Sequence, residues 1–168
     1  DAGLDYSTRS NKIAHHLAVE KTPTTPAGPA WIAQQPGFFQ TNWTGDPRQL
    51  PATRQPPPGS LQPAPCNKWA AAMGDAGWAG LLAETVVNSK KAGAYLIFKP
   101  GMDLLPLIME AQALLNSQQR WQATFSTLFP RLPPNFDCRW RFVLDGTNEA
   151  TTARRSHDGL LIDLCKPA

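Results

Sequence analysis

The stretch 94–115, "AYLIFKPGMDLLPLIMEAQALL", decides the fold because it holds a strand, a turn and a helix in direct succession. Its first six residues form a short nonpolar run rich in strand-forming types, which predicts a buried strand over 94–99. "PGMD" supplies turn residues, and we expect Asp103 to cap the helix that follows. That helix is predicted over 103–115, because Pro106 falls in its first turn, where proline is tolerated.

Alternation of nonpolar and polar residues predicts further strands on both sides of this stretch. In residues 138–144, for example, Trp140 and Phe142 alternate with Arg139 and Arg141. For residues 13–19 a helix beginning at Ser7 is an alternative, since alanine and leucine also favour helices. The predicted strands are 13–19, 94–99, 121–128, 138–144 and 160–164.

The sequence predicts a second main helix over 75–91, with two lysines near its negative end and Gly93 as its C-cap. A short helix is expected over 147–155, "TNEATTARR". Strands and helices interleave unevenly, which indicates an α/β or α+β fold: a single domain with a mixed β-sheet and two main helices.

Residues 21–65 form a long proline-rich arm, which holds 11 of the 17 prolines. This density excludes a central strand and most helix interiors. The arm also contains four large aromatic residues, Trp31, Phe38, Phe39 and Trp43, and a disordered linker would have few. We therefore expect an ordered arm packed on an α/β body over 66–168, with one short helix that opens at Pro29 and ends before Gly37.

The amino-acid composition limits the classes of protein to which the chain can belong. The chain has 168 residues, enough for one domain with a real core, and its net charge of +3 is too small to indicate nucleic acid or a membrane surface. No stretch approaches 18 consecutive nonpolar residues, so no membrane association is expected. Three scattered cysteines do not form a disulfide framework, which indicates a reducing, cytoplasmic environment. Because no initiator Met is present, we expect the chain to be part of a longer one.

His15 and His16 lie side by side just after Arg9 and Asn11, and these four residues are the candidates for binding a ligand or a partner. Neighbouring rings diverge on a strand or a helix, so they cannot easily share one metal ion. We predict no metal site and no cofactor. The simpler alternative is that one ring is buried with a carbonyl partner and the other lies near the surface.

Other motifs carry weaker signals. The glycines of "GDAGWAG" (74–80) could cradle a phosphate, but no GK[ST] ending follows them, so close packing or a turn is the better interpretation. No nucleophile has a local base beside it, and we predict no catalytic residue. Arg139 and Arg141, with the tryptophans, suggest a platform for single-stranded nucleic acid, although aromatic residues on strands are mostly core.

The motifs "LDYSTRSNKIAHHLAVE" (4–20), "GPAWIAQQPGFF" (28–39), "GDAGWAG" (74–80), "RWQATFSTLF" (120–129) and "CRWR" (138–141) together resemble a family of bacterial proteins, many of them planctomycete. They look like the N-terminal domain of the GTPase-associated protein family of predicted bacterial conflict systems. The R-x-N-x-x-A-H-H run of that family matches Arg9, Asn11, Ala14, His15 and His16. The resemblance implies a cytoplasmic module that works beside a GTPase or related NTPase, and it brings no catalytic assignment.

These observations favour a non-catalytic interaction or adaptor domain associated with a GTPase-type NTPase, or with adjacent domains of the same chain. Two alternatives belong to other classes. One is a small hydrolase or nucleotide-processing domain that uses His15 or His16. The other is single-stranded nucleic-acid binding through Arg139 and Arg141.

Overall fold

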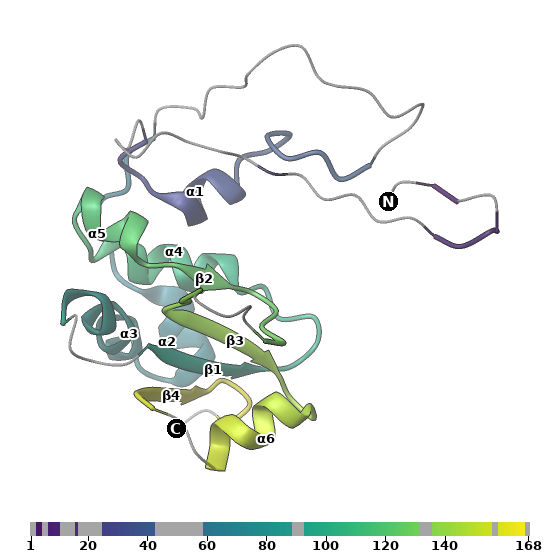
Figure 1. Cartoon of the computed structure of the whole chain (residues 1–168). Helices are drawn as coiled ribbons and strands as arrows, with labels where there is room; N and C mark the ends of the chain where they lie inside the picture. The colour runs from purple at the N-terminus through teal and green to yellow at the C-terminus, as the bar shows by residue number, and fades with distance from the viewer. Residues whose placement is uncertain are drawn as a thin grey trace.

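A computed structural model shows a four-stranded sheet with helices on both faces (Figure 1). The structure describes residues 3–4, 7–10, 16, 25–42, 59–88, 93–131, 136–155 and 158–166. The strands lie in the order β2-β3-β1-β4, and all their pairings are parallel. Their bounds are β1 Ala94–Phe98, β2 Phe125–Ser126, β3 Trp140–Leu144 and β4 Leu160–Asp163.

The α/β class is confirmed, and so are both main helices, while the described strands are uniformly parallel rather than mixed in direction. Most connections between these strands pass through helices, as parallel pairing requires. The helices are α1 Pro29–Ala33, α2 Asn67–Met73, α3 Gly77–Val87, α4 Leu105–Ala113, α5 Ser117–Gln122 and α6 Asn148–Arg155.

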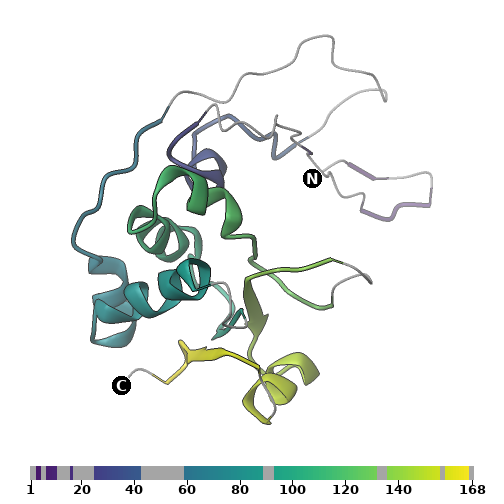
Figure 2. The same ribbon diagram turned by 60° about the vertical axis from the view of Figure 1, so that its left-hand side comes forward.

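The two faces of the sheet are covered unequally. Leu96 and Phe142 enter the larger core, which they share with residues of α2, α3 and α4. Ile97 and Val143 point to the opposite face and pack with α6. Figure 2 shows this arrangement, with the teal and green helices on one side of the sheet and the yellow-green α6 on the other. Because both faces are buried, β1 and β3 are nonpolar almost throughout.

One buried side chain fastens the described part of the proline-rich arm to the body. The guanidinium of Arg120, in α5, donates to the carbonyl oxygens of Pro26 and Leu61, each at 2.7 Å. It also donates to Gln112 O at 2.9 Å, and burial lowers the pKa of Arg120. The Gln112 side chain accepts from the backbone N–H of Ala30 at 3.3 Å. These contacts join two segments of the arm to α4 and α5.

The predicted helix in the arm is confirmed as α1, where Ala30 and Ile32 are buried. Pro29 stands in the first turn, where its missing N–H costs nothing. Ala27, Ala30, Ile32 and Phe38 are buried, and Ala30 belongs to the same core as Leu107 and Ile108 of α4.

Two expectations about strands and helices are wrong. Residues 117–122 form helix α5, and the strand expected over 121–128 is reduced to Phe125–Ser126. Asn116 and Gln119 form a capping box that starts this helix, and it outweighs the alternation of the residues that follow. Helix α2 was not expected at all.

Two expectations about helix caps are also wrong. Leu104, not Asp103, is the N-cap residue of α4, and no side chain caps it. Helix α3 ends at Val87, so Gly93 is not its C-cap; a Cβ there would collide with the carbonyl oxygen of Arg139. Of the two interpretations of the glycines in 74–80, a turn is confirmed at Gly74, which is left-handed after α2, whereas close packing is not found at Gly80, where a Cβ would meet nothing within 4 Å.

The strand expected over 13–19 lies outside the described residues, apart from the exposed His16. Among the helices that the structure describes, none is long and nonpolar enough to cross a membrane.

Candidate functional site: a nonpolar crevice at the strand ends

Strands β1 and β3 are neighbours, but the chain leaves them toward opposite faces of the sheet. After β1 it forms α4, whose Leu107 and Ile108 belong to the larger core. After β3 it forms α6, whose Ala150 and Ala153 cover the other face. In parallel α/β sheets, such a divergence opens a crevice at the carboxyl ends of the strands, and ligands usually bind there.

A crevice of about 550 Å³ is present at this point. Phe98 and Leu144, the last residues of β1 and β3, both line it. Leu128 on its wall is 63% exposed, so the crevice is open to solvent at this side chain. The other lining residues are Ala33, Met102, Leu104, Leu105, Phe125 and Thr127. The position at which related folds bind polar ligands is therefore almost entirely nonpolar here.

Neither of the two helices that start at this edge is prepared to bind a phosphate. The first turn of α4 contains Pro106, which has no N–H to offer. At the start of α6, Thr147 already accepts from the N–H of Ala150 at 3.2 Å, and Glu149 adds a negative charge in the first turn. Anion binding at a helix start needs free N–H groups and no repelling charge.

The two carboxylates at this edge are held by one arginine. Arg154 donates to Asp145 at 2.7 Å and to Asp163 at 2.9 and 3.0 Å. The hydrogen bond from Arg154 is the main reason why the pKa of Asp145 is lowered, and the same bond raises the pKa of Arg154. Both acids therefore tie α6 to the ends of β3 and β4, and the lowered pKa of Asp145 is the opposite of what a general acid needs.

The four candidate residues near the N-terminus are only partly described. Arg9 and His16 are exposed. Asn11 and His15 lie outside the described residues, so the structure does not bring the four together.

The two arginines considered for nucleic acid have acidic and aromatic neighbours. Arg139 and Arg141 lie 3.7 and 3.3 Å from carboxylate oxygens of Asp137. Arg141 also stacks on Tyr95, with its guanidinium carbon 5.0 Å from the ring centroid. The Arg141 charge is thus already matched within the protein, which weakens the nucleic-acid alternative.

The thiols carry no sign of reactivity. Cys66, Cys138 and Cys165 are all free, and burial raises the pKa of each. A reactive thiol needs a lowered pKa. Within the described ranges, no group of three or more His, Cys, Asp or Glu residues could hold a metal ion.

Reasoning from the sequence missed the crevice and the Arg120 contacts. A signal for the crevice was present, because two leucines, Leu104 and Leu105, follow directly on the turn after a predicted strand, where α/β proteins place ligand-binding loops. No local signal marked Arg120, whose partners at Pro26 and Leu61 are far away in the sequence.

The fold and the crevice define a class of protein: a parallel α/β module that is nonpolar at the strand ends, where related folds usually bind ligands. Two family models match the chain. The model of the GTPase-associated protein 1 middle domain matches residues 66–166, and that of the GTPase-associated protein 1 N-terminal domain type 2 matches residues 1–56. No curated protein and no solved structure was found to match.

The chain belongs to the GTPase-associated protein 1 family. The resemblance seen in the sequence is confirmed and also refined. Residues 1–56 match the N-terminal domain type, whereas the sheet, helices α2 to α6 and every residue that lines the crevice except Ala33 lie in the part that matches the middle domain.

Proposed function

We propose that this protein is a non-catalytic adaptor that docks on a GTPase-type NTPase in a bacterial conflict-type system in the cytoplasm. The observation that carries the proposal is the nonpolar crevice at the ends of β1 and β3, in a family described as GTPase-associated. The more specific parts of this proposal, namely the bacterial cytoplasm and the conflict system, rest on the sequence resemblance.

The lining of the crevice supports docking rather than chemistry. An acid–base or nucleophilic reaction needs at least one positioned polar group, and among the lining residues only Thr127 has a polar side chain. Nonpolar side chains such as Leu128 and Met102 instead gain free energy when a partner covers them. The crevice suits one or two nonpolar side chains of a partner.

The same edge supports the view that the nucleotide belongs to the partner. The starts of α4 and α6 offer no anion site, and the loop after β1 lacks the lysine and serine or threonine that end a phosphate-binding loop. An adaptor of this kind responds to the nucleotide only through the GTPase that it contacts.

Arg9, Asn11, His15 and His16 are proposed as a second, polar contact region for the partner. Arg9 and His16 support this role because both are exposed. We further propose that the arm, residues 21–65, and the body, residues 66–168, act as one unit, which the contacts of Arg120 support.

The test uses a purified GTPase from the native host and two matched variants. Leu128 and Val87 are 63% and 59% exposed, but only Leu128 lines the crevice. We expect Leu128→Lys to weaken binding of the GTPase at least about tenfold, because docking would bury an ammonium group in a nonpolar crevice. Val87→Lys should bind like the wild type. Equal binding by all three proteins would contradict the proposal, as would the failure of every host GTPase to bind.

A further inference from the structure

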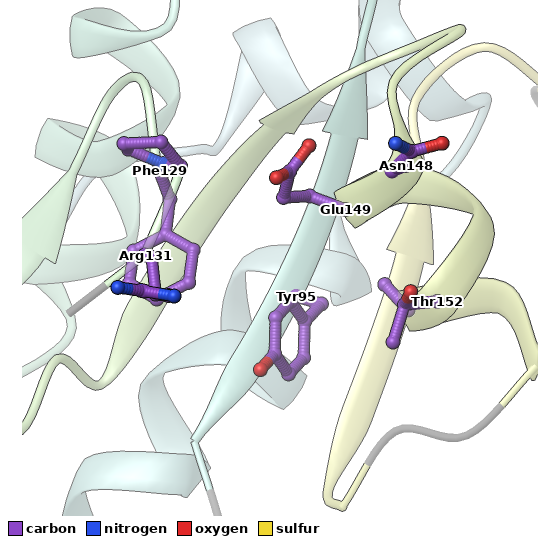
Figure 3. Close-up of a pocket in the computed structure, with 8 residues that line it drawn as sticks. Tyr95, Phe129, Arg131, Asn148, Glu149 and Thr152 are labelled. Atoms are coloured by element: carbon purple, nitrogen blue, oxygen red, sulfur yellow. The ribbon is translucent and has the colours of Figure 1, made fainter.

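A second hollow, of about 370 Å³, lies on the face of the sheet that α6 covers. Figure 3 shows Tyr95 on its floor between two walls. One wall is helix α6, with Asn148, Glu149 and Thr152, and the other is the segment after β2, with Phe129 and Arg131. We call this hollow the aromatic cleft.

Contacts among side chains hold the floor of the aromatic cleft. The rings of Tyr95 and Phe129 meet edge to face with their centroids 6.2 Å apart. Arg141 stacks on both rings, donates to the Tyr95 hydroxyl at 2.8 Å and lies 3.3 Å from a carboxylate oxygen of Asp137. The aromatic surface is therefore fixed in place, as a site for a nonpolar group requires.

The rim of the aromatic cleft carries one positive and one negative side chain, on opposite walls. Arg131 and Glu149 are both exposed, and neither forms an ion pair with any residue that the structure describes. A guanidinium recognises a carboxylate, and a carboxylate recognises an ammonium group. Asn148 and Thr152 add an amide and a hydroxyl beside Glu149.

We propose that the aromatic cleft binds a small zwitterion with a nonpolar side chain, either a free amino acid or a short peptide. The nonpolar group lies on Tyr95 and Phe129, the carboxylate faces Arg131, and the ammonium group faces Glu149. The volume of the cleft lies in the range of small-molecule sites. This ligand site is separate from the crevice, so it goes beyond the proposed docking function and does not depend on it.

Calorimetric titration of the whole chain with L-phenylalanine and its derivatives tests the proposal. N-acetyl-L-phenylalanine lacks the ammonium group and L-phenylalaninamide lacks the carboxylate. We expect each derivative to bind about two- to fivefold more weakly than L-phenylalanine, because exposed charged contacts contribute modestly. The peptide Phe-Gly-Gly distinguishes the two sources: tighter binding than L-phenylalanine assigns the cleft to short peptides, and weaker binding assigns it to free amino acids.

Two variants test which residue recognises the ammonium group of the ligand and which recognises its carboxylate. Glu149→Gln should remove the preference for L-phenylalanine over the N-acetyl derivative, and Arg131→Gln should remove the preference over the amide. Asp158→Asn and Lys166→Gln are matched controls, since both residues are exposed and outside the cleft, and they should keep both preferences. The proposal is wrong if none of these ligands binds, or if Glu149→Gln weakens L-phenylalanine and its N-acetyl derivative equally.

Discussion

Arg120 is a buried cation whose hydrogen-bond partners are backbone carbonyls rather than a carboxylate. Its guanidinium donates to carbonyl oxygens of Pro26, Leu61, Gln112 and Ala113. Carbonyl dipoles can satisfy the donors of a buried charge, but they depend on it in return, because each loses its partner when the side chain is removed. Arg120 therefore supplies much of the hydrogen bonding that holds the described part of the arm, beside the contacts of Gln112 with Ala30 and of Trp121 with Thr25.

We predict that Arg120→Ala lowers the free energy of unfolding by about 3 kcal/mol, because it leaves buried carbonyls without donors. Arg120→Lys should cost less, since an ammonium group can satisfy some of them. Urea denaturation measures both. Arg155→Ala, at an exposed position, is the control and should change stability by less than about 0.5 kcal/mol. A loss of that small size for Arg120→Ala would show that the arm does not depend on this contact.

Gly28 lies against Arg120 and permits a second residue-scale test. Its φ is +88°, and a Cβ at this position would lie 2.9 Å from the Cβ of Arg120. Gly37 also has a positive φ, +66°, but nothing lies within 4 Å of the Cβ it lacks. Both alanine variants should lose about 1 kcal/mol from backbone strain, and Gly28→Ala should lose about 1–2 kcal/mol more from the collision. Equal losses in thermal unfolding would mean that the close packing at Gly28 is unimportant.

At the scale of elements, helix α2 begins with help from a distant part of the chain. The carboxylate of Glu110, in α4, accepts from the N–H groups of Lys68, at 2.9 and 3.0 Å, and of Trp69, at 3.2 Å. Cys66, the N-cap residue of α2, gives no side-chain cap. Inspection of residues 67–73 alone could not reveal this helix, because its cap is more than 40 residues away.

We expect Glu110→Ala to lower the free energy of unfolding by about 1–2 kcal/mol, the usual cost of a lost helix cap. Glu149→Ala is the matched control, since Glu149 stands in the first turn of α6 but is exposed and accepts none of the hydrogen bonds that start the helix. It should cost less than about 0.5 kcal/mol. Similar losses for the two variants, measured by urea denaturation, would argue against the cap.

The ion pairs of Arg154 connect α6 to β3 and β4, and they predict a pH dependence. The hydrogen bond from Arg154 keeps the pKa of Asp145 below its ordinary value. Such a carboxyl stabilises the fold above its unfolded pKa, near 3.9, and this contribution is lost as the pH falls through the folded value. Stability should therefore decline below about pH 4, and Arg154→Met should reduce that decline while Arg155→Met leaves it unchanged. Parallel pH profiles for wild type and Arg154→Met would contradict this role.

The sequence predicted those elements whose signal is local. The strands at 94–98, 140–144 and 160–163 are short nonpolar runs, which sequence reasoning detects well. Residues 121–128 were misassigned because alternation over a few residues cannot be separated from a helix without the capping box that precedes it. The elements and contacts that depend on distant partners, such as α2 and the site at Arg120, had no local signal.

At the scale of the whole molecule, the two faces of the sheet and the edge where its strands end differ in what they contact. The face under α2, α3 and α4 holds the main core, and the face under α6 leaves room for the aromatic cleft. The edge where β1 and β3 end is nonpolar and open. The sequence correctly indicated the α/β class and the family, but not this edge, because the crevice gathers residues from four separate parts of the chain, at 33, 98–105, 125–128 and 144.

The most direct test of the docking account is hydrogen exchange of the chain, alone and in complex with its GTPase. Docking in the crevice should slow exchange in residues 99–105 and 125–129, which flank it, while residues 77–87 of α3 exchange at the same rate in both states. That pattern is the result we predict. Protection of α3, with residues 99–105 and 125–129 unchanged, would place the partner elsewhere and contradict the central claim.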